Sequence, residues 1–514
     1  MVLDYLSDAE PLRNFYEYSP DLEGIKKSLE QKKTHYTQRA VLYQLLKDQY
    51  ANLEIDEAVR LNLERIAEDN TFTICTAHQP CLFTGPLYFI YKILHACKLA
   101  HFLQQQFPDC HFVPIYYMGS EDADLEEVGS VDIGGVKYTW NTSQKGAVGR
   151  MKVDEALVKL LHQLEQQLSG LPNAAGVMLL LRKHFVLGTS IANATFQLVN
   201  ELFQEYGLLI LQPDAKAVKL AFLPFMEKEL KEGFSHHALK QTIHQFPDQY
   251  KVQVQGRAIN LFYLQDNSRE RIDKIENEFH FLQSNINLTE HGIMAKLHAE
   301  PECFSPNVVL RPLLQEYLLP NVAFIGGGGE LAYWLELKSV FAAAQIPYPV
   351  LVLRNSFCVV DSSLQKELVK LGLTATDFFR PLPDLVKWWM SEKHINEHDL
   401  SGAISKMDQL YKDLEQQASR VDVTLQRHVI ALKVASENKI KQLEKKLLRS
   451  LKKKHEVEIR KLEKLHALFY PGGALQERSQ NYFFLQAGKT EELISVFFEC
   501  SNSLEQQFCV LTIA

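Results

Sequence analysis

The segment Thr76–Tyr88 joins a strand-like apolar run to a helix-like run and contains side chains that could hold an anion. Thr84 is placed to cap the helix, and Pro86 suits an early helical position because its missing N–H is not needed there. Free N–H groups and the helix dipole would favour a phosphate or carboxylate above the strand end. The alternative is a well-capped helix start without a ligand. The residues predicted to bind substrate or nucleotide here are His78, Gln79, Thr84, Gly85, Tyr88 and Lys92.

A second segment, Ser120–Glu127, is rich in carboxylates and directly follows a strand-like run that ends at Met118. Carboxylates at the carboxyl end of a parallel strand lie where α/β proteins bind ligands. They could form an ion pair with a substrate amine, coordinate Mg²⁺ beside a nucleotide, or act as a general base. We predict that Glu121 and Asp122 are catalytic and that Ser120 and Asp124 bind substrate or nucleotide. The alternative is an acidic first turn that favours its helix dipole, and most of the cluster is expected to be structural.

A third segment, Ile325–Glu330, contains four consecutive glycines between a strand-like run and a helix-like run. Such glycines let the backbone approach a ligand and direct N–H groups toward it, although the pattern is neither a P-loop nor a complete GxGxxG motif. Arginines nearby could pair with carboxylates or phosphates, or could form structural salt bridges. The predicted ligand-binding residues are Arg311, Gln315, Gly326, Gly327, Gly328, Gly329, Glu330 and Arg354.

Cys75, His78 and Cys81 have the spacing C-x2-H-x2-C, which invites a zinc interpretation. The set offers three ligands, whereas a structural zinc ion takes four, and a strand-to-turn backbone would direct Cys75 away. We therefore predict no zinc site.

Alternating apolar runs and helical patterns predict an α/β core that contains a parallel sheet. The predicted strands cover residues 72–76, 112–118, 208–212, 259–264, 322–325 and 350–353, and helices are predicted at 87–107, 155–168, 195–206 and 330–344. Because no Pro-, Ser- or Gly-rich linker marks a boundary, the stretches at about 130–200 and 216–306 are predicted to be insertions into one core that covers residues 71–395.

Both ends of the chain differ from this core. Residues 1–70 read as helices. Residues 396–470 carry apolar seams at heptad spacing, which predict two helices folded back as an antiparallel coiled coil that serves dimerisation, with Asp422 as a cap at the turn. The segment 471–514 is predicted to return to the core. The basic stretch from Lys439 to His466 is interpreted as a solvated helix face rather than a phosphate site.

Composition excludes several classes of protein. The 514 residues are 46% hydrophobic and 23% charged, which is ordinary for a soluble globular protein. The net charge of −8 argues against nucleic acid as a partner. Neither a secretory signal after Met1 nor a membrane-spanning run is expected, and eight scattered cysteines are read as buried thiols in a reducing compartment. A cytoplasmic location is predicted.

Taken together, these segments resemble the cysteine-adding family of bacillithiol biosynthesis, the cysteine ligase BshC family. Thr84-Gly85-Pro86-Leu87-Tyr88 with Tyr91-Lys92, the acidic segment Ser120–Glu127 and the segment Ser305–Trp334 match its motifs in order. Shorter matches at Gly149–Met151, Asn260–Leu264, Arg269–Arg271 and Leu475–Arg478 extend the resemblance over nearly the whole chain. Ala77-His78-Gln79 replaces the family's Gly-Gln-Gln, Cys81 replaces a glycine, and Asp422-Val423 replaces an Asp-Pro turn.

The resemblance implies a Rossmann-like core with inserted connecting segments and a coiled coil that pairs two subunits into a homodimer. It implies the substrates cysteine and glucosaminyl-malate, and it adds Asn260 and Arg478 to the predicted binding residues. Joining a carboxylate to an amine requires activation, so ATP or another adenine nucleotide is expected, through either an acyl-adenylate or an acyl phosphate.

Two other functions remain open at this point. The first is an adenylating or nucleotidyl-transferring enzyme that acts on a different amino acid, since no KMSKS-like loop fixes the nucleotide chemistry. The second is a non-catalytic dimeric coiled-coil protein that binds a ligand without converting it. The Gly, acidic and Arg residues gathered at strand ends disfavour this second reading.

Overall fold

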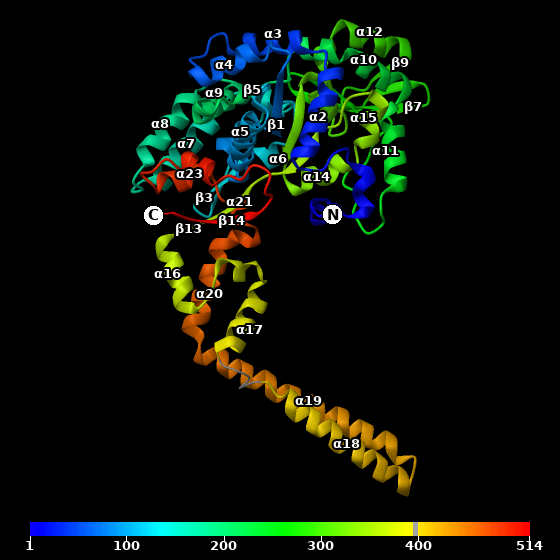
Figure 1. Cartoon of the computed structure of the whole chain (residues 1–514), viewed down its shortest axis with the longest axis vertical. Coiled ribbons are helices and arrows are strands. Elements are labelled where there is room, and N and C mark those ends of the chain that lie inside the picture. Colours follow the sequence, from blue (N-terminus) through cyan, green and yellow to red (C-terminus); the bar gives the residue numbers. More distant parts are fainter. Residues whose placement is uncertain (394–398, 514) are drawn as a thin grey trace. The chain divides into compact units, whose positions relative to one another are not determined.

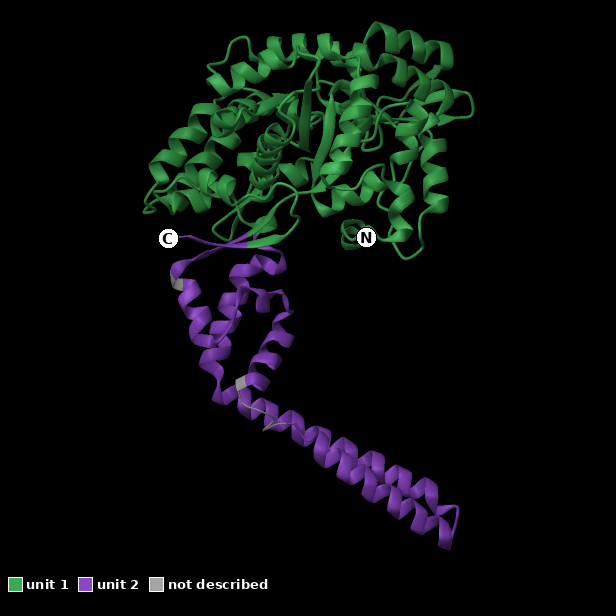
Figure 2. Cartoon of the chain, in the orientation of Figure 1, with its two compact units in different colours: residues 1–357, 477–509 green, residues 358–476, 510–514 purple. Residues whose placement is uncertain are grey.

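The computed structural model describes residues 1–393 and 399–513 (Figure 1). The chain divides into two compact units, which Figure 2 colours separately: residues 1–357 with 477–509, and residues 358–476 with 510–514. The domain boundary predicted near residue 395 lies outside the described residues. None of the helices in the described parts of the chain is both long and apolar enough to cross a bilayer.

The first unit begins with helices, as predicted for residues 1–70. They are α1 (Val2–Leu6), η1 (Glu10–Phe15), α2 (Leu22–His35), α3 (Arg39–Tyr50) and α4 (Glu57–Arg65). The Asp21 side chain caps α2 by accepting a hydrogen bond from the Gly24 N–H. Ile25 and Leu29, one turn apart on α2, are buried in the cluster that covers the central sheet.

The centre of this unit is a parallel five-stranded sheet, which confirms the predicted fold class. Its strands are β1 (Thr71–His78), β2 (His111–Met118), β5 (Leu209–Leu211), β11 (Asn321–Gly326) and β12 (Val350–Leu353), in the spatial order β12-β11-β1-β2-β5. The chain moves outward from β1 through β2 to β5 and then returns to the other side of β1 at β11. This reversal creates a switch point between β1 and β11, where α/β sheets bind ligands beyond the carboxyl ends of their strands.

Helices connect these strands. The crossover between β1 and β2 contains α5 (Tyr88–Gln106), close to the predicted range, and the connection before β5 contains α9 (Ile191–Phe203) with η4 (Gln204–Tyr206). The single helix predicted over 330–344 is wrong, because the chain forms α14 (Gly328–Leu335) and α15 (Lys338–Ala344). At the break, the Glu336 and Leu337 N–H groups bond to the Tyr333 and Trp334 carbonyls, three residues back. The buried Glu336 carboxylate there accepts hydrogen bonds from the Gln253 and Val254 N–H groups at 2.7 and 2.8 Å.

Two long connections carry additional structure. The one after β2 holds α6 (Leu125–Val128), β3 (Ser130–Ile133), β4 (Val136–Thr139), η3 (Val148–Arg150), α7 (Glu155–Leu168) and α8 (Ala174–His184). The predicted helix at 155–168 is confirmed as α7.

The connection after β5 forms a second sheet, antiparallel, in the order β10-β6-β7-β8-β9. The strands of this sheet are β6 (Leu261–Gln265), β7 (Ser268–Ile275), β8 (Glu278–Phe281), β9 (Ile286–Thr289) and β10 (Phe304–Pro306). The helices of the same connection are α10 (Lys216–Glu232), α11 (Phe234–Gln245), α12 (Glu290–Ala299), η5 (Pro301–Cys303) and, after β10, α13 (Leu310–Leu318). The strand predicted at 259–264 is β6 and belongs to this sheet rather than to the parallel one.

The second unit is mainly helical. Its helices are α16 (Ser362–Leu371), η6 (Ala375–Phe379), α17 (Leu382–Lys393), α18 (Ser401–Val421), α19 (Leu425–Lys454), α20 (Glu456–Phe469) and η7 (Pro471–Gly473). Helices α18 and α19 form the predicted antiparallel hairpin (Figure 1), tied by a 2.7 Å hydrogen bond between the Tyr411 and Ser436 hydroxyls. Asp422 is not the N-cap of α19: it ends α18, and its carboxylate accepts hydrogen bonds from the N–H and hydroxyl of Thr424, which precedes α19.

The last part of the chain contains α21 (Gln476–Ser479), α22 (Tyr482–Ala487) and α23 (Leu493–Cys500). Residues 477–509 belong to the first unit, and α23 packs against α5. A separate two-stranded sheet joins β13 (Ser356–Asp361) to β14 (Phe508–Ile513).

Candidate functional site

A cavity of about 620 Å³ lies in the first unit at the switch point of the parallel sheet. The ends of β1 and β2 and the residues that follow β11 contribute to its wall, and loops around the antiparallel sheet complete it. Its volume is typical of a site for a small molecule or cofactor. The predicted residues that line it are His78, Gln79, Tyr88, Glu121, Asp122, Arg311, Gly327, Gly329, Glu330, Arg354 and Arg478. The tertiary structure therefore brings together residues from all three segments singled out in the sequence.

The loop after β1 is shaped by distant residues rather than by helix capping. Phe83, Thr84 and Gly85 all have positive φ, at 48°, 65° and 65°. The Asn481 amide holds this strained loop by donating hydrogen bonds to the Phe83 and Gly85 carbonyls at 2.8 and 2.6 Å. The prediction that Thr84 caps the following helix is wrong, because α5 begins only at Tyr88 and its N-cap residue, Leu87, makes no side-chain cap.

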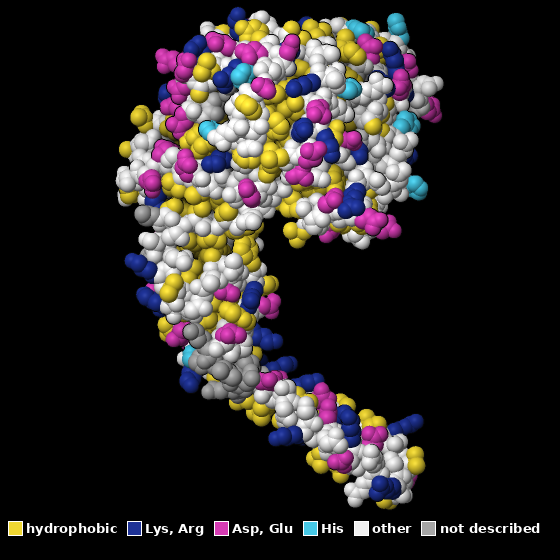
Figure 3. All heavy atoms as spheres, in the orientation of Figure 1, with side chains coloured by type: hydrophobic (Ala, Val, Ile, Leu, Met, Phe, Trp, Pro, Cys, Tyr) yellow, Lys and Arg dark blue, Asp and Glu magenta, His cyan; other side chains and the backbone are white. Residues whose placement is uncertain are grey.

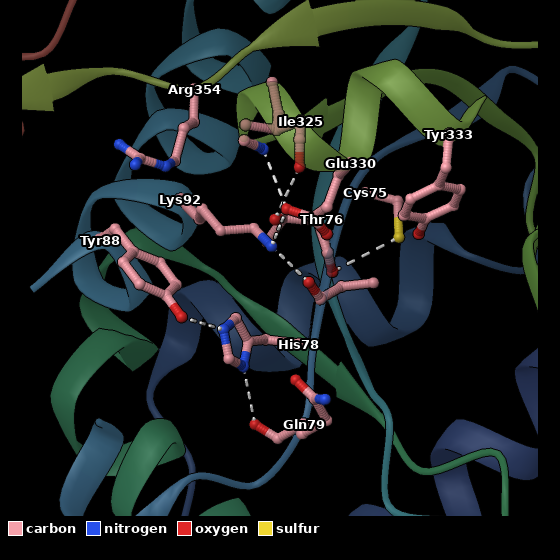
Figure 4. A network of polar contacts seen from close by, with 12 residues as sticks. Cys75, Thr76, His78, Gln79, Tyr88, Lys92, Ile325, Glu330, Tyr333 and Arg354 are labelled. Atoms are coloured by element: carbon pink, nitrogen blue, oxygen red, sulfur yellow. Dashed lines mark hydrogen bonds and ion pairs between the residues drawn. The ribbon is translucent and has the colours of Figure 1, made fainter. Parts of the chain in front are cut away.

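A buried ion pair connects this part of the chain to the glycine segment (Figure 4). The Lys92 ammonium lies 2.7 Å from the Glu330 carboxylate and 2.5 Å from the Ala77 carbonyl, and Glu330 also accepts a 2.9 Å hydrogen bond from the Gly327 N–H. Burial alone would raise the pKa of Glu330, but Lys92 and the Gly327 N–H lower it below its usual value. The positive charge of Lys92 is thus balanced inside the protein.

Two arginines at the cavity wall differ in their partners. The Arg354 guanidinium pairs in a bidentate manner with Glu477, at 2.8 and 2.6 Å, so its charge is compensated. The Arg311 guanidinium donates to the Tyr333 hydroxyl at 2.6 Å and to the Gln315 side-chain oxygen at 3.3 Å, both neutral groups. Within residues 1–393 and 399–513, Arg311 forms no ion pair with a carboxylate. Arg257 and Arg478 of the same wall also form no ion pair with a carboxylate of the described residues, but both are exposed to solvent, whereas Arg311 is half-buried. A bound anion would therefore interact most strongly with Arg311, because its charge is less screened by water.

Glu121, predicted to be catalytic, lies at the cavity wall in a buried ion pair. The Lys219 ammonium, which is completely buried, contacts its carboxylate and also donates a 3.1 Å hydrogen bond to the Phe304 carbonyl. The Ser305 hydroxyl donates to the other carboxylate oxygen at 3.3 Å. Burial raises the pKa of Glu121, and Lys219 partly offsets this effect. These contacts favour a structural role for Glu121.

Asp122 and Glu127 form a more accessible acidic edge. The Gln79 side-chain amide donates to both carboxylates, at 3.0 Å to Asp122 and 3.4 Å to Glu127, and an Arg269 nitrogen lies 3.8 Å from Asp122. Burial, followed by the nearby charges of Asp124 and Asp122, raises the pKa of Glu127 above its usual value. This edge can accept hydrogen bonds from an ammonium group and can take up a proton.

Several predicted binding residues do not line the cavity: Thr84, Gly85, Lys92, Ser120, Asp124, Asn260, Gln315, Gly326 and Gly328. Asp124 instead caps α6 by accepting a 3.1 Å hydrogen bond from the Glu127 N–H. Asn260 is fully buried, and its amide donates to the Ser235 hydroxyl and the Arg257 carbonyl. The Gln315 amide donates to Glu316. Gly85 lines a neighbouring cavity of about 250 Å³ that shares Tyr88, Glu127 and Arg478 with the first.

Sequence reasoning missed other residues of the wall, among them Tyr117, Glu127, Arg257, Phe262, Arg269, Asn307 and Tyr333. Arg269 and Phe262 lie inside motifs that match the resembled family, which could have identified them. Their guanidinium and ring stack at 4.1 Å. Arg257 lies in none of the matching motifs, and it reaches the cavity only because the insertion at about 216–306 folds against the parallel sheet.

No group of three or more metal-ligating side chains lies together among the residues that the structure describes. The Cys81 sulfur lies 3.6 Å from the His78 Nδ1, whereas the Cys75 sulfur contacts the Thr76 carbonyl, also at 3.6 Å. The acidic edge is the part of the cavity wall whose oxygen ligands suit Mg²⁺.

Comparison with known proteins agrees with this architecture. Residues 1–355 match the family model described as "Bacillithiol biosynthesis BshC, N-terminal Rossmann-like domain", and residues 357–513 match "Bacillithiol biosynthesis BshC, C-terminal coiled-coil domain". Proteins named "Putative cysteine ligase BshC" from Flavobacterium johnsoniae, Flavobacterium psychrophilum and Christiangramia forsetii are each 36% identical to this chain. They align with 100%, 99% and 100% of it and with 97%, 96% and 96% of their own lengths.

A solved structure titled as a putative arginyl-tRNA synthetase from Campylobacter jejuni aligns with 90% of this chain and 98% of its own. Its sequence identity is 10% and its TM-score is 0.24, too low to indicate a shared fold.

Proposed function

The chain belongs to the BshC family of bacillithiol biosynthesis, and from this membership we propose that it is a cysteine ligase that joins L-cysteine to glucosaminyl-malate. The bond formed is an amide between the cysteine carboxyl group and the sugar amine. ATP, when bound, would supply the activation that a free carboxylate needs before an amine can attack it.

The observation that carries the proposal is the division of charge along one cavity wall. Arg311 offers a guanidinium without a carboxylate partner among the described residues, and Gly327 and Gly329 bring the start of α14 to the same wall. These groups suit phosphates or a carboxylate. The carboxylates of Asp122 and Glu127 suit an ammonium group, so the cavity has complementary places for both reactants.

The acidic edge also provides for the proton of the attacking amine. A sugar ammonium must lose one proton before its nitrogen can form the new bond, and the Glu127 carboxylate can accept it because its pKa is raised. Asp122, linked to Glu127 through the Gln79 amide, would hold the cation in the ground state. Glu121 is less suited to this task, since Lys219 occupies its carboxylate.

The direct test is a mass-spectrometric assay of purified protein with glucosaminyl-malate, cysteine and ATP. We expect the amide product, with AMP indicating an acyl-adenylate and ADP an acyl phosphate. Replacement of cysteine by serine is the matched control and should give no product. Folded protein that binds both substrates but forms no product with any nucleotide would refute the proposed activity.

We also propose that the α18–α19 hairpin pairs two copies of the chain. Leu410, Leu414 and Leu443 on this hairpin remain exposed, at 55%, 41% and 50% of their surface. Figure 3 shows hydrophobic side chains on its open face. Exposed apolar side chains on a helical hairpin favour packing against a further helical partner. Light scattering should give a dimer mass, and replacing these leucines by glutamate should give a monomer mass.

A further inference from the structure

His78 and Tyr88 face each other in the wall of the larger cavity, and Tyr88 also lines the smaller one (Figure 4). His78 is the last residue of β1 and Tyr88 is the first residue of α5. The His78 Nε2 lies 3.3 Å from the Tyr88 hydroxyl oxygen, and the two ring centres are 5.4 Å apart. The pair therefore joins the central strand to the start of its crossover helix at the edge of the site.

The position of the His78 ring proton follows from the backbone. Nδ1 lies 3.1 Å from the Gln79 carbonyl oxygen. A carbonyl oxygen can only accept a hydrogen bond, so Nδ1 must carry the proton. The Cys81 sulfur, 3.6 Å from Nδ1, lies on the same side of the ring and can act there only as a weak acceptor. In a neutral imidazole, Nε2 then presents a lone pair to Tyr88.

The surroundings of His78 keep its ring neutral. Burial and the Lys92 ammonium lower the pKa of His78 to about 4, and Arg354 acts in the same direction, against the opposing charge of Glu330. Because Nε2 has no proton at neutral pH, the Tyr88 hydroxyl must be the donor in their hydrogen bond. The single proton of the phenol is thereby used, and its oxygen has only lone pairs left for a ligand.

The Tyr88 ring is also fixed from another direction. The Arg354 guanidinium lies over it, 5.3 Å from the ring centre, and Glu477 holds that guanidinium through two hydrogen bonds. A phenol held by His78 and Arg354 loses little further freedom when a ligand binds. Its oxygen is therefore a preorganised acceptor, which a donor group on the ligand can use at small entropic cost.

We propose that Tyr88 is the acceptor that positions the attacking amino group of the aminosugar substrate, and that His78 fixes Tyr88 in this role. The inference rests on the proposed function and names the amine subsite of the same cavity. An amine or ammonium donates to the Tyr88 oxygen and to the neighbouring Glu127 carboxylate, which lines both cavities with it. The Tyr88 oxygen and the Glu127 carboxylate offer a carboxylate or phosphate only lone pairs, and the third residue that lines both cavities, Arg478, is an exposed guanidinium. The half-buried Arg311, without a carboxylate partner among the described residues, is the group to which we assign the anionic reactants.

The test compares Tyr88→Phe with the unaltered protein in two reactions. Phenylalanine keeps the ring and its contact with Arg354 but removes the acceptor oxygen. We expect the KM for glucosaminyl-malate to rise about 10- to 100-fold, as for loss of a hydrogen bond to a charged group, with the KM for cysteine unchanged. Cysteine-dependent turnover of ATP measured without the aminosugar should also be unchanged.

Two variants of His78 separate positioning from a general packing effect. Glutamine can present a side-chain oxygen to the Tyr88 hydroxyl, so His78→Gln should keep the KM for the aminosugar near its original value. His78→Leu removes the acceptor and should raise that KM while leaving the KM for cysteine unchanged. An equal rise in both KM values for Tyr88→Phe, or no rise in either, would overturn the assignment while the ligase activity stood.

A second measurement does not depend on turnover. Nitrogen-15 NMR of histidine-labelled protein, with the His78 signal identified by its loss in His78→Gln, should show a neutral ring protonated at Nδ1 between pH 6 and 8. A ring protonated at Nε2, or a charged ring at pH 7, would overturn the inference. Absence of any ligation by the unaltered protein would refute the proposed function and the amine subsite with it.

Discussion

Replacement of Glu121 by glutamine tests whether its ion pair with Lys219 is structural. The change keeps the shape of the side chain and an oxygen that can accept from Lys219, but it removes the negative charge. The Lys219 ammonium is completely buried, and its other hydrogen-bond acceptor is the neutral Phe304 carbonyl. Removing one partner of a buried pair typically costs about 3–5 kcal/mol because a charge remains without compensation. The unfolding equilibrium constant should therefore rise about 100- to 4,000-fold.

The assay is chemical denaturation of the full chain. Hydrogen exchange of the peptides that contain β2 and α10 locates the loss in the first unit. The double variant Glu121→Gln with Lys219→Met removes both charges and should recover most of the lost stability. Asp124→Asn is the matched control: it also neutralises one carboxylate of the acidic segment, yet Asp124 is an exposed helix cap that asparagine can replace, so the change should be below about 0.5 kcal/mol.

A catalytic Glu121 would behave differently. Glu121→Gln would then abolish turnover with little loss of stability, and the second substitution at Lys219 would restore nothing. If the pair is structural, Glu121→Gln should lose stability, the second substitution at Lys219 should restore it, and the double variant should retain its turnover within about tenfold. Stability of Glu121→Gln within about 1 kcal/mol of the unaltered protein would refute the reasoning.

Three further predictions concern the cavity wall and its loop. Arg311→Gln should lower kcat/KM about 100-fold or more by removing an uncompensated guanidinium, whereas Tyr333→Phe, which keeps that charge, should cost less than tenfold in the same steady-state assay. The pKa of Glu127 is raised, and the Glu127 carboxylate becomes protonated as the pH drops below that pKa. Since a protonated carboxyl group cannot act as the base, kcat/KM should fall over the same pH range. Glu127→Gln should remove this acid limb and lower the plateau about 100-fold, and a limb that survives the substitution would exclude Glu127 as the base. Gly85→Ala should destabilise the fold by about 1–3 kcal/mol in thermal unfolding, because the added Cβ would lie 2.8 Å from the Cys81 Cβ at a φ of +65°. Gly135→Ala is its control for strain alone, since φ is +80° there but no atom lies within 4 Å.

Local patterns were sufficient to predict the strands of the parallel sheet and several of the long helices. The buried strands β2, β11 and β12 contain short apolar runs, β1 alternates apolar residues with buried threonines, and α7 follows from its amphipathic spacing and its Asp154 cap. The α18–α19 hairpin follows from two heptad seams. These features depend on residues that are near one another in the sequence, and their hydrophobic periodicity is a direct consequence of which face is buried.

Local patterns failed where distant residues decide the backbone. In the sequence, Thr84 is well placed to cap a helix. In the structure, Asn481, almost 400 positions later, binds the loop at residues 83–85, whose backbone has positive φ, and α5 begins only at Tyr88. Likewise, the single helix predicted over 330–344 is two helices, α14 and α15, and the buried Glu336 between them accepts hydrogen bonds from the N–H groups of residues 253 and 254. No pattern within the segment itself contains these partners.

The sequence by itself determined that chemistry-bearing residues follow several parallel strands, and the geometry of such sheets requires those strand ends to meet. Only the tertiary structure decided which of the charges are available. Lys92, Glu121 and Arg354 look equally suited to bind a ligand when read along the chain, but Glu330, Lys219 and Glu477 neutralise them in the fold. Arg311 has no carboxylate partner among the described residues, and the carboxylates of Asp122 and Glu127 stay accessible at the cavity wall, where we propose that the substrates bind. The physical reason is that a buried charge is stable only with a partner, and that partner is chosen by three-dimensional proximity rather than by position in the sequence.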